Sequence, residues 1–115
     1  MGNVIAALNP HAEFKVMLAS HMDEIGLMIH HIGEDGYLHF QMIGGNDSVI
    51  ADGQRVWVHG RQRVPGVVGR KSMTVQSPSE GKAKPSAKEL WIDIGAATKA
   101  EAEAVVSLGD VATFQ

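Results

Sequence analysis

The chain has 115 residues, enough for one domain with one hydrophobic core and too few for the two-domain layout of large enzymes. Hydrophobic residues make up 44% of it, and no apolar run approaches the ~20 residues of a membrane-spanning helix. The absence of cysteine excludes disulfides, cysteine-ligated zinc and a thiol nucleophile, and the net charge of -3 gives no basic footprint for nucleic acid. The composition therefore predicts a soluble globular protein that binds neither nucleic acid nor membranes.

The first residues lack the positive charge and the long apolar stretch of a secretory signal, so we expect a cytoplasmic protein. Two short apolar runs follow, at 4–8 and 14–19, with an Asn-Pro pair between them. Short apolar runs separated by a polar turn are typical of paired strands. This segment therefore predicts a hairpin.

The clearest turn signal is the Gly-Glu-Asp-Gly sequence at 33–36, between apolar stretches at 25–32 and 37–43. An Asp-Gly pair supplies the positive-φ residues that a tight reversal between antiparallel strands requires. In the second stretch polar and apolar residues alternate, so we expect one apolar face and one wet face. These stretches predict a second hairpin.

The apolar pattern predicts four more strands, at 55–60, 63–69, 89–95 and 111–114. Pro65 limits the placement of the second of them, because a proline in a sheet sits at a strand start, on an edge or at a bulge. Residues 70–88 are rich in serine, lysine and proline, and they predict a mobile surface loop.

One short helix is predicted, over 100–106. Thr98 can cap it by accepting the backbone N–H of Glu101, whose own side chain completes a capping box. Gly109 suits a left-handed conformation just after the helix. Many short strands, glycine turns and one helix predict a mainly β fold, a small closed or nearly closed Greek-key β-barrel.

His21 and Asp23 form the one cluster with a clear chemical meaning, directly after an apolar run. At a strand end, residues i and i+2 project to the same side, so the imidazole and the carboxylate converge. Such a pair suits a metal ligand and the acidic residue that orients it. The bare spacing is common, and a polar strand end with surface charges is the alternative.

The run at 15–28, Lys-Val-Met-Leu-Ala-Ser-His-Met-Asp-Glu-Ile-Gly-Leu-Met, resembles the first metal-site signature of a family of dinuclear metallopeptidases. That family includes the glutamyl aminopeptidases and the tetrahedral aminopeptidases, some of which once carried the label endoglucanase. Further segments resemble it in the same order, at 2–6, 43–45, 66–69, 91–96 and 109–111. The chain departs from many relatives after Gly69, where it lacks their histidine.

This resemblance implies both a domain division and a site. Residues 1–26 resemble a remnant of the catalytic domain, and 27–115 resemble the β-barrel lid and dimerisation domain. His21 corresponds to a ligand of one of two metal ions, zinc or cobalt, and Asp23 to the acidic residue that supports catalysis. In the family the other ligands and the general base come later, so a chain that stops at Gln115 is expected to be a truncated member.

We therefore expect a fragment of a metal-dependent aminopeptidase, an enzyme class that removes amino-terminal residues from peptides. By itself it is expected to be inactive, because each zinc takes about four ligands, and to self-associate as an oligomerisation module. The alternative is an independent small barrel with a binding or scaffold role. A complete single-metal hydrolase would require His30, His39 or Asp93 to meet His21.

The other histidines and the methionines have simpler interpretations. His30 and His31 are expected on opposite faces of a strand, with one of them beside His39. Cross-strand polar pairing is favoured there over a two-histidine surface site. His11 and His59 are predicted to be solvated. The methionines are expected to fill gaps in a core or an interface, and they are Met17, Met22, Met28, Met42 and Met73.

Overall fold

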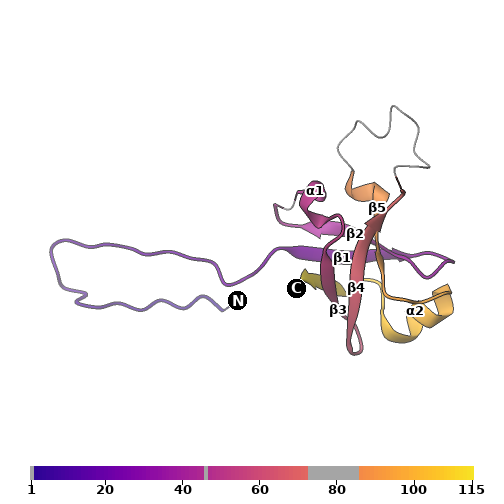
Figure 1. Cartoon of the computed structure of the whole chain (residues 1–115). Coiled ribbons are helices and arrows are strands. Elements are labelled where there is room, and N and C mark those ends of the chain that lie inside the picture. The colour runs from indigo at the N-terminus through magenta and orange to yellow at the C-terminus, as the bar shows by residue number, and fades with distance from the viewer. Residues whose placement is uncertain (1, 46, 73–85) are drawn as a thin grey trace.

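Six antiparallel strands close into a barrel in the order β1-β2-β5-β4-β3-β6, with β6 paired to both β1 and β3 (Figure 1). The computed structural model describes residues 2–45, 47–72 and 86–115. In chain order the elements are β1 (Gly26–Ile32), β2 (Leu38–Ile43), α1 (Ser48–Ala51), β3 (Arg55–His59), β4 (Arg63–Arg70), the 3₁₀ turn η3 (Ala87–Glu89), β5 (Leu90–Asp93), α2 (Lys99–Val105) and β6 (Val111–Phe114). The closed, mainly β barrel that the sequence predicts is confirmed.

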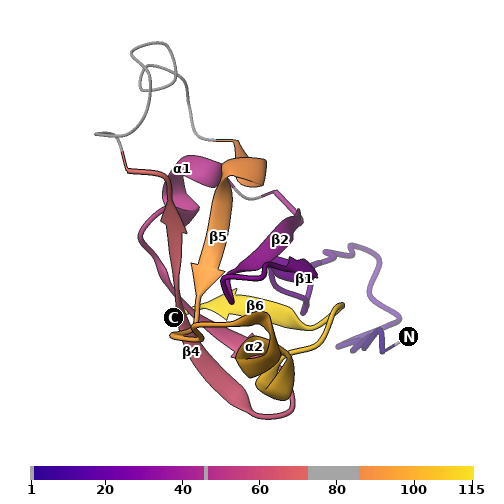
Figure 2. The ribbon, with the colours of Figure 1, turned by 90° about the vertical axis from the view of Figure 1, so that its right-hand side faces the viewer.

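The strands are connected as a Greek key. β3, β4 and β5 follow one another both in sequence and in space, and β6 returns to lie beside β3. The helices lie at the two ends of the barrel, with α1 and η3 at one end and α2 at the other (Figure 2). The closed sheet thus has its helical segments at its openings.

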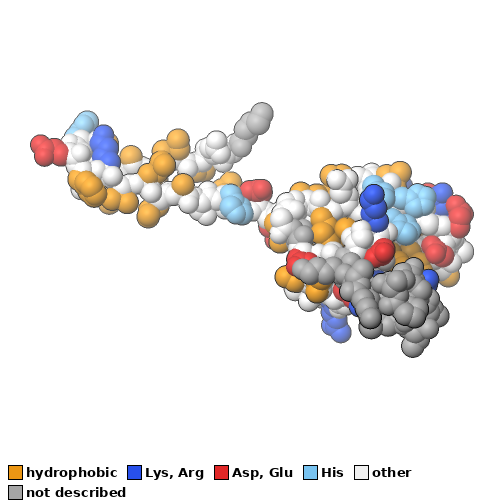
Figure 3. Space-filling model, turned by 90° about the horizontal axis from the view of Figure 1, so that it is seen from above, with side chains coloured by type: hydrophobic (Ala, Val, Ile, Leu, Met, Phe, Trp, Pro, Cys, Tyr) orange, Lys and Arg blue, Asp and Glu red, His pale blue; other side chains and the backbone are white. Residues whose placement is uncertain are grey.

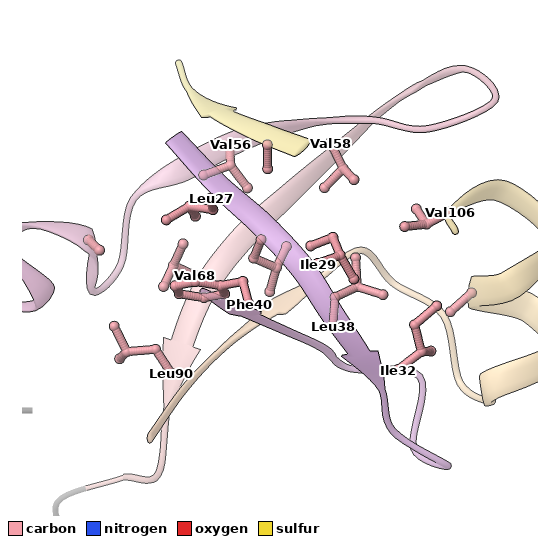
Figure 4. Packing of buried hydrophobic residues seen from close by; sticks show 14 residues of the cluster. Leu27, Ile29, Ile32, Leu38, Phe40, Val56, Val58, Val68, Leu90 and Val106 are labelled. Atoms are coloured by element: carbon pink, nitrogen blue, oxygen red, sulfur yellow. The ribbon is translucent and has the colours of Figure 1, made fainter. Parts of the chain in front are cut away.

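Buried hydrophobic side chains fill the barrel interior (Figure 4). In β2, Leu38 and Phe40 are buried, whereas Gln41, which follows Phe40, is exposed, as the alternating pattern predicts. Full burial of one such side chain is worth roughly 1.5–3 kcal/mol relative to exposure. The core consists of Leu27, Ile29, Ile32, Leu38, Phe40, Ala51, Val56, Val58, Val68, Leu90, Ile92, Ala102, Val106 and Ala112. All six strands and both α-helices contribute to this one core.

The turn between β1 and β2 has the predicted form. The Gly33 N–H donates to the Tyr37 carbonyl oxygen at 2.9 Å, and the Gly36 N–H donates to the Gly33 carbonyl oxygen at 3.0 Å. Gly36 has a φ of 81°, in the left-handed region that favours glycine. The reversal at 33–36 is therefore confirmed.

A β-bulge interrupts the pairing of β1 with β2, between Ile29 and His31. His31 is paired with His39, which leaves His30 as the extra residue on β1. Ile29 and Ile32 are both buried, whereas His30 and His31 are both exposed. The expectation that His30 and His31 lie on opposite faces is wrong, because the bulge breaks the two-residue period of the strand.

α2 begins and ends one residue before the predicted bounds of 100–106. The Thr98 hydroxyl accepts the Glu101 N–H at 3.3 Å, as predicted. The Glu101 carboxylate accepts the N–H of Ala97 at 2.8 Å, one residue before the cap. Gly109 has a φ of 91°, so its left-handed conformation is confirmed.

α1 is a helix that the sequence does not predict. Asp47 caps it, accepting the Val49 N–H at 3.0 Å. A single turn is too short to show a helical period of apolar residues, so the periodicity gives no sign of it. Within the ranges that the structure describes, no helix has the length and apolar character needed to cross a bilayer.

Pro65 lies inside β4, opposite Trp57 of β3. The pairing of β4 with β5 begins only at Val67. On the side of β4 that faces β5, Pro65 therefore has no strand partner in the described sheet. Of the strand-start, edge and bulge positions open to this proline, the structure shows the edge position.

The loop predicted over 70–88 lies mainly outside the described residues, which omit 73–85. Arg70 is the last residue of β4. On the far side, Ser86 caps η3, with its N–H donating to the Glu89 carboxylate at 2.8 Å. A capped 3₁₀ turn thus directly precedes β5.

Residues 2–25 form an arm that extends from the barrel and doubles back on itself (Figure 1). The chain reverses where the Ala12 N–H donates to the Asn9 carbonyl oxygen at 3.0 Å, but neither limb of the arm is a strand. The hairpin predicted there is wrong. An isolated two-stranded hairpin is marginally stable, and the apolar side chains of this arm have no sheet or helix to pack on.

Candidate functional site

His21 and Asp23 lie in the arm, shortly before β1. Their side chains are 81% and 92% exposed, and they belong to no strand, so the expected strand-end geometry is wrong. The two side chains nevertheless meet: the His21 Nδ1 lies 3.3 Å from an Asp23 carboxylate oxygen. They meet in a segment without regular secondary structure and not in a pleated strand.

A second contact orients the imidazole of His21. Its Nδ1 lies 2.7 Å from the backbone carbonyl oxygen of Asp23, so a neutral ring donates its Nδ1–H there. The Nε2 lone pair then remains open toward solvent. A histidine that binds a metal through one nitrogen commonly donates from the other to a carbonyl or carboxylate, so this geometry suits a metal ligand.

The His21–Asp23 pair falls short of a complete metal site. Zinc takes about four ligands, and two metal ions need more donors than one imidazole and one carboxylate. In the described parts of the chain, no group of three or more His, Cys, Asp or Glu side chains could hold a metal ion. The residues present therefore do not fit a two-metal centre, and His30, His39 and Asp93 do not complete a site with His21.

Three histidines gather instead on the outside of the barrel. The rings of His31 and His39 have centroids 5.5 Å apart and are tilted by 39°. Partial burial lowers the pKa of His39 below 6.5, and the nearby His31 and His30 lower it further, while Asp35 opposes them. The cross-strand pairing of His31 with His39 that the sequence predicts is confirmed.

His11 and His59 are exposed, as predicted. The Nε2 of His59 also lies 2.8 Å from the Thr113 hydroxyl, which joins β3 to β6. Of the methionines, Met42 packs against the core, whereas Met17 and Met22 are exposed in the arm. Met28 is 42% exposed on β1, and Met73 lies outside the described residues.

An open groove that the sequence analysis missed runs beside β3 and β4. It encloses about 400 Å³, and its lining includes Trp57, Pro65 and Asp93. The guanidinium of Arg63 lies 4.3 Å from the centre of the Trp57 ring, a cation–π contact. The strand register creates this surface, since Trp57 and Pro65 are directly opposite each other.

The sequence profile of the M42 glutamyl aminopeptidases matches residues 2–115. The chain belongs to this family. Aminopeptidases of the M42 family are metal-dependent hydrolases. The resemblance seen in the run at 15–28 and in the later segments is therefore confirmed at the level of the family.

Individual M42 relatives agree with this assignment. The lysyl aminopeptidase of Pyrococcus furiosus is 39% identical over 106 residues, which cover 90% of this chain and 30% of that protein. The TET aminopeptidase from the marine sediment archaeon Thaumarchaeota archaeon SCGC AB-539-E09 superposes with a TM-score of 0.76 at 36% identity. That match covers 80% of this chain and 27% of the relative's.

The TET1 peptidase of Pyrococcus horikoshii also shares the fold, with a TM-score of 0.73 and 35% identity over 84% of this chain and 29% of its own. That peptidase can assemble into a tetrahedron or a large octahedral shell. The chain spans about a third or less of the length of the curated relatives that it matches, between 26% and 32%.

Proposed function

We propose that this chain is part of a metal-dependent aminopeptidase, in which 27–115 form the lid and oligomerisation barrel and 1–26 belong to the catalytic domain. The distribution of burial carries the proposal. Every residue of the hydrophobic core lies at or after Leu27, whereas apolar arm residues such as Ile5 and Leu18 are exposed. The barrel is thus a self-contained unit, and the arm is a segment whose apolar side chains require a partner surface.

In the complete enzyme, His21 binds one metal ion, zinc or cobalt, and Asp23 supports it in catalysis. The contact between the His21 Nδ1 and the Asp23 carbonyl oxygen favours this role, because it leaves Nε2 open. Amino-terminal residues of peptides are the substrate class. Among the described residues no third donor joins this pair, so we expect the chain alone to hydrolyse no peptide.

The same proposal assigns self-association to the chain, as a homodimer or a higher oligomer in the cytoplasm. The arm presents exposed apolar side chains on both limbs, among them Ile5, Phe14 and Leu18. Contiguous apolar surface of this kind favours association with another protein surface. The assembly of the related TET1 peptidase into closed shells supports this role.

Sedimentation velocity of the purified 115-residue chain tests the association. We expect a dimer or larger species. Leu18→Glu should weaken association through the apolar arm, and a dimer that persists in this variant is assigned to the barrel. The matched control is Leu108→Glu, because Leu108 is also exposed but lies on the barrel side of the chain, after α2. A monomer at every accessible concentration would contradict the oligomerisation role and favour an independent barrel.

Turnover of leucyl, lysyl and glutamyl anilides by the same chain, loaded with zinc or cobalt, tests the catalytic part. We expect no hydrolysis above the rate of the free metal. The His21→Ala variant serves to recognise a contaminating peptidase, because this substitution cannot change the activity of another enzyme. Turnover that His21→Ala abolishes and His11→Ala preserves would contradict the proposed inactivity of the chain alone.

A further inference from the structure

The β1 bulge places two histidines on the outside of the barrel, opposite a third. His30 and His31 are both exposed, and His31 is the cross-strand partner of His39 on β2. Figure 3 shows histidine side chains gathered in pale blue on this part of the barrel surface. The bulge is thus what turns a pair of adjacent histidines into a one-sided cluster.

The spacing of His31 and His39 matches that of two imidazoles on one metal ion. An imidazole nitrogen binds a first-row transition metal at about 2.0–2.1 Å, which puts the ring centre roughly 3.2 Å from the metal ion. Two rings bound at a tetrahedral angle then have centres roughly 5.2 Å apart. The observed centroid distance is 5.5 Å, close to this value.

The environment of His39 also favours the neutral imidazole that binds metals. Burial and then the neighbouring His31 lower the pKa of His39, with His30 acting in the same direction and Asp35 against it. His39 is half-buried between β1 and β2, so its ring is held in place by its neighbours. A ring that is already positioned loses less conformational entropy on binding.

We propose that His31 and His39 form a surface site for a divalent first-row transition-metal ion. Across the described part of the chain no third side chain of suitable type completes the site, so water fills the remaining positions. By the general order of affinity for nitrogen ligands, Cu²⁺ should bind two imidazoles and water more tightly than Ni²⁺ or Zn²⁺, whereas the tetrahedral spacing suits Zn²⁺. The site lies on the barrel and is independent of the arm residues His21 and Asp23.

Titration calorimetry of the full chain with Cu²⁺ at neutral pH tests the proposal. Loss of a neighbouring hydrogen-bond partner alone costs a metal site roughly tenfold or more in affinity, so loss of a ligand should cost at least that. We expect His31→Gln and His39→Gln each to weaken the binding by this factor. His11→Gln, which removes an exposed histidine of the arm outside both proposed sites, should leave the affinity within about twofold.

A second measurement needs no variant and therefore does not depend on the folding of one. Cu²⁺ is paramagnetic, and at low Cu²⁺ it should broaden the amide resonances of β1 and β2 around His31 and His39 first. Broadening confined to the arm around His21, or an affinity unchanged in both His31→Gln and His39→Gln, would overturn the proposal. Neither result bears on the family assignment, which rests on the match over residues 2–115.

Discussion

The Nε of Arg70 lies 2.6 Å from a carboxylate oxygen of Asp52, so the end of β4 is tied to the turn that follows α1. The two side chains are only 28% and 26% exposed. Backbone bonds run alongside this ion pair, since the Gly53 N–H donates to the Val68 carbonyl oxygen at 2.9 Å. The pair therefore fixes one end of the barrel, next to the loop that leaves β4.

Asp52→Asn should lower the free energy of unfolding by about 1 kcal/mol, because it removes one charge of a partly shielded ion pair. Arg70→Gln should have a similar effect, and the double variant should lose less than the sum of the two. Urea unfolding measures all three. Glu34→Gln is the control: Glu34 pairs with Lys99 at 3.2 Å but is 89% exposed, and we expect a change within about 0.5 kcal/mol. Equal losses in both pairs would contradict the role assigned to burial.

Gly36→Ala should destabilise the barrel strongly. At Gly36 an added Cβ would lie 2.5 Å from the Ala96 carbonyl oxygen, a backbone atom that cannot move aside easily, and φ is 81°. Gly53→Ala is a matched control, with a similar φ of 77° but nothing within 4 Å of the added Cβ. We expect about 1–2 kcal/mol for Gly53→Ala from the left-handed backbone alone and a clearly larger loss for Gly36→Ala.

Thermal or urea unfolding of the two glycine variants measures the loss of stability in each. The difference between the losses isolates the contact of the β1–β2 turn with the segment before α2. If Gly36→Ala and Gly53→Ala were equally stable, that close approach would have no energetic importance.

The barrel could be predicted from local signals that act over a few residues. Alternating burial in β2, the glycine turn at 33–36 and the Thr98 cap are each encoded by neighbours in sequence, and the structure has all three. The family resemblance rested on residues scattered along the whole chain, and the family match covers 2–115.

The features that the sequence did not predict depend on contacts distant in sequence or on missing partners. The bulge at His30 exists because Ile29 and Ile32, three residues apart, both enter the core. The apolar arm has the pattern of two strands, but it lacks a sheet to join. In the candidate site, the meeting of His21 with Asp23 was predicted, but the strand end expected to produce it is absent from this described segment.

Ile92→Ala should reduce the free energy of unfolding by about 2–5 kcal/mol, through lost hydrophobic burial and the cavity that remains. Ile92 is fully buried on β5, where it is paired with residues of both β2 and β4. Ile50→Ala removes the same atoms from α1, where the side chain is 67% exposed, and we expect a loss below about 1 kcal/mol. Denaturant unfolding of both variants checks this, and similar losses would place the core elsewhere.

His39 should make the stability of the barrel depend on pH. Burial, followed by the charge of His31, lowers the pKa of His39 in the folded state below its unfolded value of 6.5. Between these two pKa values the unfolded chain binds more protons than the folded one, so stability rises with pH. Its contribution is complete above pH 6.5 and is lost as the pH falls from there through the folded pKa.

His39→Gln should remove this part of the pH dependence, because glutamine does not titrate. Urea midpoints measured in metal-free buffer on both sides of pH 6.5 should therefore differ less in His39→Gln than in the unchanged chain. His11→Gln, which removes an exposed imidazole of the arm, should retain the original difference. If His39→Gln kept the full pH dependence, the protonation of His39 would not be linked to folding. The partial burial of its ring would then have no measurable effect on stability.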